Sequence, residues 1–291
     1  MGRIELVAVD MDNTMIMPGM SETLSNVAAM ERAKEMGVRI VPCTARPWYG
    51  AQGFFRLFPF DEYAITCNGA GLVDTHSGKI HDLVTLGAKD MPAVLDALLS
   101  MEEWLDIRVN TERGYGEWIP TQKEAYREEL GIRLFGAAPS LRFSYRDWDA
   151  FIEGVSGSVL RILCHVEQTD EALLQKTKER IAHIMPMEIE ITDDIFIEIT
   201  APGMDKGKRL SQLCDMLQIP REAVMAIGDN KNDISMVSYA GVGVSVHHGH
   251  PELKKVADVV APPYEEGGIY AVIEEYIHNS RAYYGRPARA F

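Results

Sequence analysis

The chain has 291 residues, of which 46% are hydrophobic, 25% are charged and 8% are aromatic. This composition is typical of a globular protein, and the length is sufficient for two domains. The formal net charge of -14 repels nucleic-acid backbones, so we expect no nucleic-acid partner. The sequence contains no signal peptide and no apolar run of membrane-spanning length, so we expect no membrane association. Four scattered cysteines without a C-x-x-C spacing indicate reduced thiols in a cytoplasmic protein.

The first 84 residues predict an α/β arrangement. The apolar run Leu6–Val9 does not alternate with polar residues, which favours a strand covered on both faces of a parallel sheet. Ser21 is expected to cap the N-terminus of a helix over residues 21–36, and Gly37 is expected to end it. Residues 38–44 predict a second strand, which completes a βαβ unit. The dipeptides at 68–69 and 77–78 then predict two hairpin turns.

Residues 85–199 predict a different, α+β arrangement. Residues 187–192 and 194–200 alternate as antiparallel strands do, in a sheet with one open face. After residue 200 a helix, two apolar strands and further helices restore the α/β pattern. The sequence therefore predicts a Rossmann-like, doubly wound parallel-sheet core in residues 1–84 and 200–291. An inserted α+β domain is expected in residues 85–199, with boundaries uncertain by several residues.

Polar residues stand at the carboxyl ends of the predicted core strands, where open α/β sheets bind their ligands. Two acids follow the first strand, a threonine ends the second, and two more acids follow the strand over residues 223–228. One lysine lies in a comparable position, in a glycine-flanked loop that opens a helix. We expect these side chains to converge on one crevice: Asp10, Asp12, Thr44, Asp229, Asp233 and Lys206.

This combination predicts phosphoryl chemistry. Neighbouring carboxylates at a buried rim repel each other, and Mg²⁺ relieves that repulsion while binding phosphate oxygens. Lys206 and the Thr44 hydroxyl can bind a phosphoryl group. Asp10 can attack phosphorus and form an aspartyl-phosphate. Asp12 would then protonate the leaving oxygen and later activate water.

Four segments in order, "DMDNT", "CTAR", "MDKGKRL" and "GDNKND", resemble the motifs of the haloacid dehalogenase superfamily of phosphatases. The α+β insertion between the second and third motifs resembles the C2 (type IIB) cap of the Cof-like subgroup. The resemblance implies that Asp10 is the nucleophile and that Asp12 is the general acid/base. It implies a cap that closes over the crevice, excludes water and supplies specificity.

The same resemblance implies the binding residues. Mg²⁺ would be bound by Asp10, the backbone carbonyl of Asp12 and Asp229, with Asp233 supporting the metal. The transferring phosphoryl group would be held by Thr44, Lys206 and Asn232.

The sequence thus predicts a Mg²⁺-dependent phosphatase that acts on a small phosphorylated metabolite, as a monomer or homodimer. Sugar phosphates rank ahead of nucleotide and cofactor phosphates as substrates. A phosphomutase on the same scaffold is the nearest alternative, because the residues named here do not separate it from a phosphatase. A non-catalytic phosphometabolite-binding protein is the alternative from another class, since a fold alone proves no activity.

Several local alternatives stay open. Arg46 either contacts substrate or pairs with an acid at the rim, and Asp233 either supports the metal or caps the following helix, or does both. Asn13 replaces the glycine that is usual after the second aspartate, and asparagine tolerates a positive φ there. The histidines in residues 247–250 match no standard zinc spacing, so a transition-metal site is a minor alternative. A calcium-binding EF-hand that starts at Asp10 is excluded, because Ser21 occupies the position of its glutamate.

Overall fold

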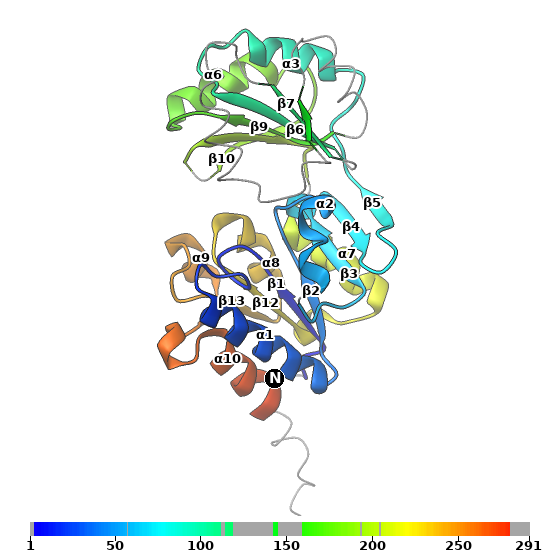
Figure 1. Cartoon of the computed structure of the whole chain (residues 1–291), viewed down its shortest axis with the longest axis vertical. Helices are drawn as coiled ribbons and strands as arrows, with labels where there is room; N and C mark the ends of the chain where they lie inside the picture. The colour runs from blue at the N-terminus through cyan, green and yellow to red at the C-terminus, as the bar shows by residue number, and fades with distance from the viewer. Residues whose placement is uncertain are drawn as a thin grey trace, which may run out of the picture. The chain divides into compact units, whose positions relative to one another are not determined.

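The computed structural model describes residues 3–56, 58–111, 114–118, 142–144, 159–192, 194–203 and 205–279. The chain divides into two compact units (Figure 1). The first unit comprises Met1–Arg46, Ala51–Leu83 and Met204–Phe291, and the second comprises Pro47–Gly50 and Val84–Gly203. Assignment of residues 85–199 as a cap domain stays a prediction.

A five-stranded parallel sheet forms the centre of the first unit, in the order β14-β13-β12-β1-β2. Strand β1 pairs with β12 on one side and with β2 on the other. The beginning and the last third of the chain therefore meet at the middle of this sheet, and the predicted doubly wound core is confirmed. The strands are β1 (Leu6–Val9), β2 (Arg39–Pro42), β12 (Val224–Gly228), β13 (Val242–Ser245) and β14 (Val259–Val260).

Helices cover both faces of this sheet because successive strand residues point to opposite sides. Val7 and Val9 of β1 belong to a core with residues of α1 and α10, which lie side by side in Figure 1. Leu6 and Ala8 belong to a second core with residues of α7, α8 and α9. The helices are α1 (Met20–Glu35), α7 (Lys206–Leu217), α8 (Ile234–Tyr239), α9 (Pro251–Val256) and α10 (Gly268–Ile273), which a π-helical segment, Glu274–Asn279, continues.

The predicted N-cap of the first helix is wrong. Helix α1 is capped by Gly19, whose backbone is extended, and Ser21 already lies inside the first turn. The Ser21 hydroxyl donates a hydrogen bond to the Glu22 carboxylate at 2.7 Å instead of capping the helix. The predicted end is confirmed, since Gly37 follows the helix with a φ of 76°, which glycine adopts without strain.

A three-stranded antiparallel sheet, β3 (Tyr63–Thr66), β4 (Gly71–Asp74) and β5 (Ile80–Leu83), extends the first unit. The turns between its strands contain the 68–69 and 77–78 dipeptides, so both predicted hairpins are confirmed. The backbone N–H of Thr44 donates to the Ile65 carbonyl at 2.8 Å, which places β3 beside the end of β2. A short helix, α2 (Trp48–Ala51), lies between these segments in sequence.

In its described residues, the second unit contains a six-stranded sheet and two helices that share its apolar core. The strand order is β10-β11-β9-β6-β7-β8, and the predicted antiparallel pair at residues 187–200 is confirmed as β10 and β11. The elements are α3 (Met91–Leu99), β6 (Asp106–Thr111), β7 (Tyr115–Trp118), β8 (Arg142–Ser144), β9 (Val159–His165), α6 (Glu171–Ile181), β10 (Glu188–Thr192) and β11 (Phe196–Thr200).

Charged side chains of the second sheet are more buried than the predicted open face suggests. Asp106, Arg108 and His165 are 0%, 2% and 3% exposed. They pair with one another: Arg108 Nε lies 2.7 Å and His165 Nδ1 lies 2.9 Å from the Asp106 carboxylate. Buried charges persist when they have such partners, which the alternating sequence pattern alone does not reveal.

Two further observations concern the described helices and the cysteines. In the part of the chain that the structure describes, no helix combines the length and apolarity needed to span a membrane. The four cysteines are buried free thiols, and Cys43 lies next to Thr44. Burial raises the pKa of the Cys43 thiol far above its ordinary value, so the folded state favours its protonated form.

Candidate active site

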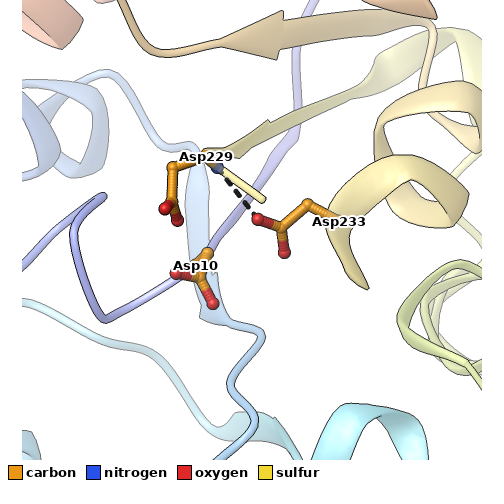
Figure 2. A group of neighbouring side chains, drawn as sticks. All are labelled: Asp10, Asp229 and Asp233. Carbon is orange, nitrogen blue, oxygen red and sulfur yellow. Dashed lines mark hydrogen bonds between the residues drawn. The ribbon is translucent and has the colours of Figure 1, made fainter. Parts of the chain in front are cut away.

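Three aspartates meet at the carboxyl ends of β1 and β12 (Figure 2). Asp10 directly follows β1, and its backbone N–H donates to the Ile227 carbonyl at 2.9 Å. Asp229 directly follows β12, and Asp233 lies in the 3-10 turn that comes next. One carboxylate oxygen from each aspartate lies within 4.8 Å of the others. The sheet therefore brings together three of the predicted site residues.

Lys206 lies between two of these acids. Its Nζ donates to Asp10 Oδ1 at 2.6 Å and to Asp233 Oδ1 at 2.6 Å, and the side chain is fully buried. Burial alone lowers the pKa of a lysine, but the two carboxylates outweigh it and raise the Lys206 pKa above its ordinary value. Lys206 is therefore a fixed positive charge, as the sequence predicted from its position at the start of a helix.

Asp233 is held by the backbone around it. Its Oδ2 accepts hydrogen bonds from the backbone N–H groups of Asp229 at 2.9 Å and Asn230 at 3.0 Å. The carboxylate thus completes a capping box on its own turn, and it makes no side-chain cap on α8, contrary to one of the two predicted roles. Gly228 makes room for it, because a Cβ there would lie 2.5 Å from the Asp233 carboxyl group.

The cluster carries more negative than positive charge. Burial, and then the charges of neighbouring aspartates, raise the pKa of Asp10 well above its ordinary value, although Lys206 opposes this shift. Burial and the Asp233 charge likewise raise the pKa of Asp229. A divalent cation would relieve this repulsion, and carboxylate oxygens are the donors that Mg²⁺ prefers. The residues present therefore fit a bound Mg²⁺.

The Asp12 carboxylate is not part of this group of three aspartates and binds Arg46 instead. Arg46 Nε donates to Asp12 Oδ2 at 2.7 Å, and Nη2 donates to Oδ1 at 2.6 Å. The guanidinium also lies over the Phe54 ring, 4.9 Å from its centroid. Of the two predicted roles for Arg46, the structure shows the pairing with an acid. The turn after Asp12 passes through Asn13 with a φ of 59°, so the predicted positive φ is confirmed.

The predicted phosphate-binding residues Thr44 and Asn232 are both connected to Asn68. Thr44 is buried, its hydroxyl accepts from the Arg46 backbone N–H at 3.0 Å, and its carbonyl accepts from the Asn68 N–H at 3.1 Å. Asn232 is exposed, and its Nδ2 donates to Asn68 Oδ1 at 3.0 Å. Both residues are therefore hydrogen-bonded to the same turn, which follows β3.

Two contacts of the site have no counterpart in the sequence prediction. The hydroxyl of Thr14 donates to Asp229 Oδ1 at 2.9 Å and links the first motif to the last. His248 Nε2 lies 2.7 Å from the Asn13 carbonyl, which can only accept, so this nitrogen carries the proton and donates. Thr14 stands four residues after Asp10, and a hydroxyl on the same turn as a proposed nucleophile is the signal that indicates it.

The histidine-rich segment does not form a metal site within the described residues. Among the described residues, the group of side chains that could hold a metal ion consists of Asp10, Asp229 and Asp233 and contains no histidine. His250 Nδ1 instead accepts from the Glu252 N–H at 3.1 Å and caps helix α9, while His248 binds Asn13.

Comparisons with known proteins agree on one family. A family model described as haloacid dehalogenase-like hydrolase matches residues 7–273. The pyridoxal phosphate phosphatase YbhA of Escherichia coli (strain K12) is 27% identical over 261 residues, which cover 88% of this chain and 92% of that protein.

Solved structures share the fold. A haloacid dehalogenase-like hydrolase from Bacteroides thetaiotaomicron superposes with a TM-score of 0.76 at 22% identity, covering 94% of this chain and 99% of that chain. A structure described as a subclass IIB sugar phosphatase superposes with a TM-score of 0.71 at 21% identity, covering 94% and 98%.

Proposed function

Because this chain belongs to the haloacid dehalogenase-like hydrolase family and is a phosphatase, we propose that it acts through an aspartyl-phosphate on Asp10 with Mg²⁺ as cofactor. The resemblance that the four sequence motifs predicted is thereby confirmed. The observation that carries the proposal is the position of Lys206, which donates to Asp10 and Asp233 at 2.6 Å each. A buried cation beside a carboxylate cluster suits the binding and transfer of a phosphoryl group.

In the first step Asp10 attacks the phosphorus atom. Lys206 holds Oδ1 of Asp10, so Oδ2 is the oxygen that we assign to the attack. A bond forms between Oδ2 and phosphorus, the bond from phosphorus to the leaving oxygen breaks, and Asp12 gives its proton to that oxygen. Both Asp12 oxygens accept from Arg46 in the structure, so one of these hydrogen bonds must open before Asp12 protonates the leaving group.

In the second step water attacks the phosphoryl group on Asp10. Asp12 takes a proton from this water, the bond between phosphorus and Asp10 breaks, and inorganic phosphate leaves. Thr44, Lys206 and Asn232 are the proposed binding residues for the phosphoryl oxygens in both steps. Lys206 supplies a full charge, whereas Thr44 and Asn232 supply hydrogen-bond donors.

The residues proposed to hold Mg²⁺ are Asp10, Asp229 and the backbone carbonyl of Asp12, with Asp233 as the supporting carboxylate. A bound divalent ion would neutralise charge on the phosphoryl group. The raised pKa values of Asp10 and Asp229 support this assignment, because burial and the charge of Asp233 raise both of them and a bound cation would offset these effects.

We assign small phosphorylated metabolites as substrates. Sugar phosphates come first and cofactor phosphates second, since a structural neighbour is described as a sugar phosphatase and a relative as a pyridoxal phosphate phosphatase. The α+β unit is proposed to be the cap that contributes substrate selectivity. The net charge of -14 disfavours nucleic acid as a partner, and a cytoplasmic monomer or homodimer is our proposal for the native form.

The test is phosphate release from a panel of sugar, nucleotide and cofactor phosphates, with Mg²⁺ and then with chelator. Asp10→Asn should abolish release, and Asp215→Asn, at an exposed position on helix α7, should leave it unchanged. Release that persists in Asp10→Asn contradicts the proposal. Formation of an isomeric phosphate without free phosphate indicates a phosphomutase, and ligand binding without any turnover indicates a sensor.

A further inference from the structure

Three successive residues of the turn after β3 have positive φ values. The values are 49° for Cys67, 51° for Asn68 and 102° for Gly69. Glycine adopts such values freely, but a residue with a Cβ in this region costs about 1–3 kcal/mol. Backbone strain of this kind persists only where the surrounding structure fixes it, and it concentrates at functional sites.

The surroundings of the turn fix it from several directions. Gly69 packs directly on the loop that precedes Lys206, since a Cβ there would lie 2.3 Å from the Asp205 carbonyl oxygen. Arg209, fully buried on α7, donates from Nε to the Gly69 carbonyl at 2.8 Å. The backbone N–H of Asn68 donates to the Thr44 carbonyl at 3.1 Å. The turn is therefore attached to both the second and the third motif.

This attachment brings the Asn68 side chain to the fourth motif. Its Oδ1 accepts from Asn232 Nδ2 at 3.0 Å, across 164 residues of sequence. The hydrogen bond fixes the orientation of the Asn232 amide. Because the Asn68 Oδ1 oxygen can only accept, the NH₂ group of Asn232 and not its carbonyl oxygen must point towards it. One hydrogen of that NH₂ group binds Asn68, and the second stays available to donate to a phosphoryl oxygen. Asn232 is exposed, so without this partner its amide has a broad choice of rotations.

We propose that Asn68 is a positioning residue for phosphoryl binding, which orients the Asn232 amide by accepting its hydrogen bond. The strained turn places the acceptor, and the contacts with Thr44, Asp205 and Arg209 keep it in place. This role rests on the proposed function of Asn232. It extends the site to a residue outside the four motifs.

The decisive variant is Asn68→Gly. Glycine adopts a φ of 51° without strain but has no amide, so the variant should unfold at the same temperature as the wild type or higher. Its inhibition constant for inorganic phosphate, measured with Mg²⁺ and p-nitrophenyl phosphate, should rise roughly 3- to 10-fold, the equivalent of one hydrogen bond. Asn68→Asp keeps the acceptor oxygen and should retain the orientation of Asn232, although its charge repels phosphate. The matched control is Gln218→Gly, which also replaces a residue with a positive φ (56°) by glycine, here at the exposed C-terminal end of α7. It should leave phosphate inhibition unchanged.

A double-mutant cycle separates positioning from direct contact. In an Asn232→Ala background, Asn68→Gly should weaken phosphate inhibition no further, because the amide that Asn68 orients is gone. An equal loss in both backgrounds, or an Asn68→Gly variant with wild-type inhibition, overturns the role of Asn68 while the phosphatase proposal stands. Turnover by Asp10→Asn would instead overturn the proposed function. Failure of the Asn68 role and failure of the proposed function are thus distinguished, because each is tested by a different variant.

Discussion

Arg46 donates hydrogen bonds to both carboxylate oxygens of Asp12, with Nε–Oδ2 and Nη2–Oδ1 distances of 2.7 and 2.6 Å. A planar guanidinium fixes a carboxylate in orientation as well as in position, because two parallel hydrogen bonds define a plane. The proposed general acid/base is thus held by the last residue of the second motif, two positions after Thr44.

Loss of the Arg46–Asp12 ion pair should impair the step in which Asp12 protonates the leaving oxygen. Arg46→Lys keeps the charge but loses the paired geometry, and Arg46→Ala loses both. Turnover of a sugar phosphate should fall roughly 10- to 100-fold in Arg46→Ala, less than the roughly 100- to 10,000-fold of a full general acid–base effect, because Asp12 itself remains. Turnover of p-nitrophenyl phosphate should fall less, since p-nitrophenolate leaves without protonation. Arg32→Ala, which removes a surface ion pair with Glu35, is the control. An equal fall for both substrates would show that Arg46 does not act through Asp12.

Replacement of Lys206 by methionine should destabilise the folded protein. The variant leaves Asp10 and Asp233 buried without their shared cation, and removal of one partner from a buried pair costs about 3–5 kcal/mol. Urea unfolding in chelator should therefore show a lower free energy of unfolding than the wild type, and added Mg²⁺ should restore part of it. Lys208→Met, at an exposed position two residues later, should change little. A Lys206→Met protein of wild-type stability in chelator would contradict the role of this charge.

Neutralisation of Asp229 should stabilise the metal-free protein at neutral pH. Burial and the Asp233 charge raise the pKa of Asp229 above 3.8, so the folded state favours its protonated form. The stability that this preference provides is complete below the ordinary carboxyl pKa and is lost as the pH rises through the raised value.

Asp229→Asn should therefore unfold at the same temperature as the wild type near pH 4 and at a higher temperature at pH 7, both in chelator. Two like charges about 4 Å apart repel by roughly 1 kcal/mol even in water, which corresponds to about 2–4 °C in a domain of this size. Mg²⁺ should raise the unfolding temperature of the wild type more than that of the variant. Parallel pH curves for the two proteins would refute this account.

A methyl group at Gly228 should disturb the site without touching its chemistry. The added Cβ would lie 2.5 Å from the Asp233 carboxyl group, so that side chain must move. Gly228→Ala should lose about 1–3 kcal/mol of unfolding free energy, typical of overpacking, and should require more Mg²⁺ for half-maximal turnover. Gly53→Ala, where no atom lies within 4 Å of the new Cβ, is the matched control. Unchanged Mg²⁺ dependence in Gly228→Ala would contradict the support role of Asp233.

Sequence patterns predicted the parts of this site that depend on strand ends. The apolar run Leu6–Val9 required a strand buried on both faces, and Asp10 had to follow it at the carboxyl edge. The same reasoning applied to Asp229 after β12, and the start of α7 fixed the place of Lys206. In each case a local sequence pattern predicts the end of the strand or the start of the helix on which the residue lies. The order of the strands in the sheet then brings these residues together.

The remaining features depend on contacts between distant segments. Arg46 has a long side chain, and its direction follows from Asp12 and Phe54, which no local pattern brings near it. Asn68-Gly69 reads as an ordinary hairpin turn, and its strained backbone becomes visible only when Arg209 and Asp205 are placed against it. Ser21 had a capping pattern, but α1 already begins at Met20, so its N-cap is Gly19, two residues before Ser21.

The 196-residue separation between Asp10 and Lys206 has a consequence for synthesis on the ribosome. The nascent chain presents Asp10, the proposed nucleophile, almost at once, but β1 gains its β12 neighbour only after residue 224 has emerged. Until then the α+β unit can fold while the sheet of the α/β unit is incomplete. A messenger truncated before its last third therefore yields a chain that still pairs Asp12 with Arg46 but lacks Lys206, the cation that pairs with Asp10.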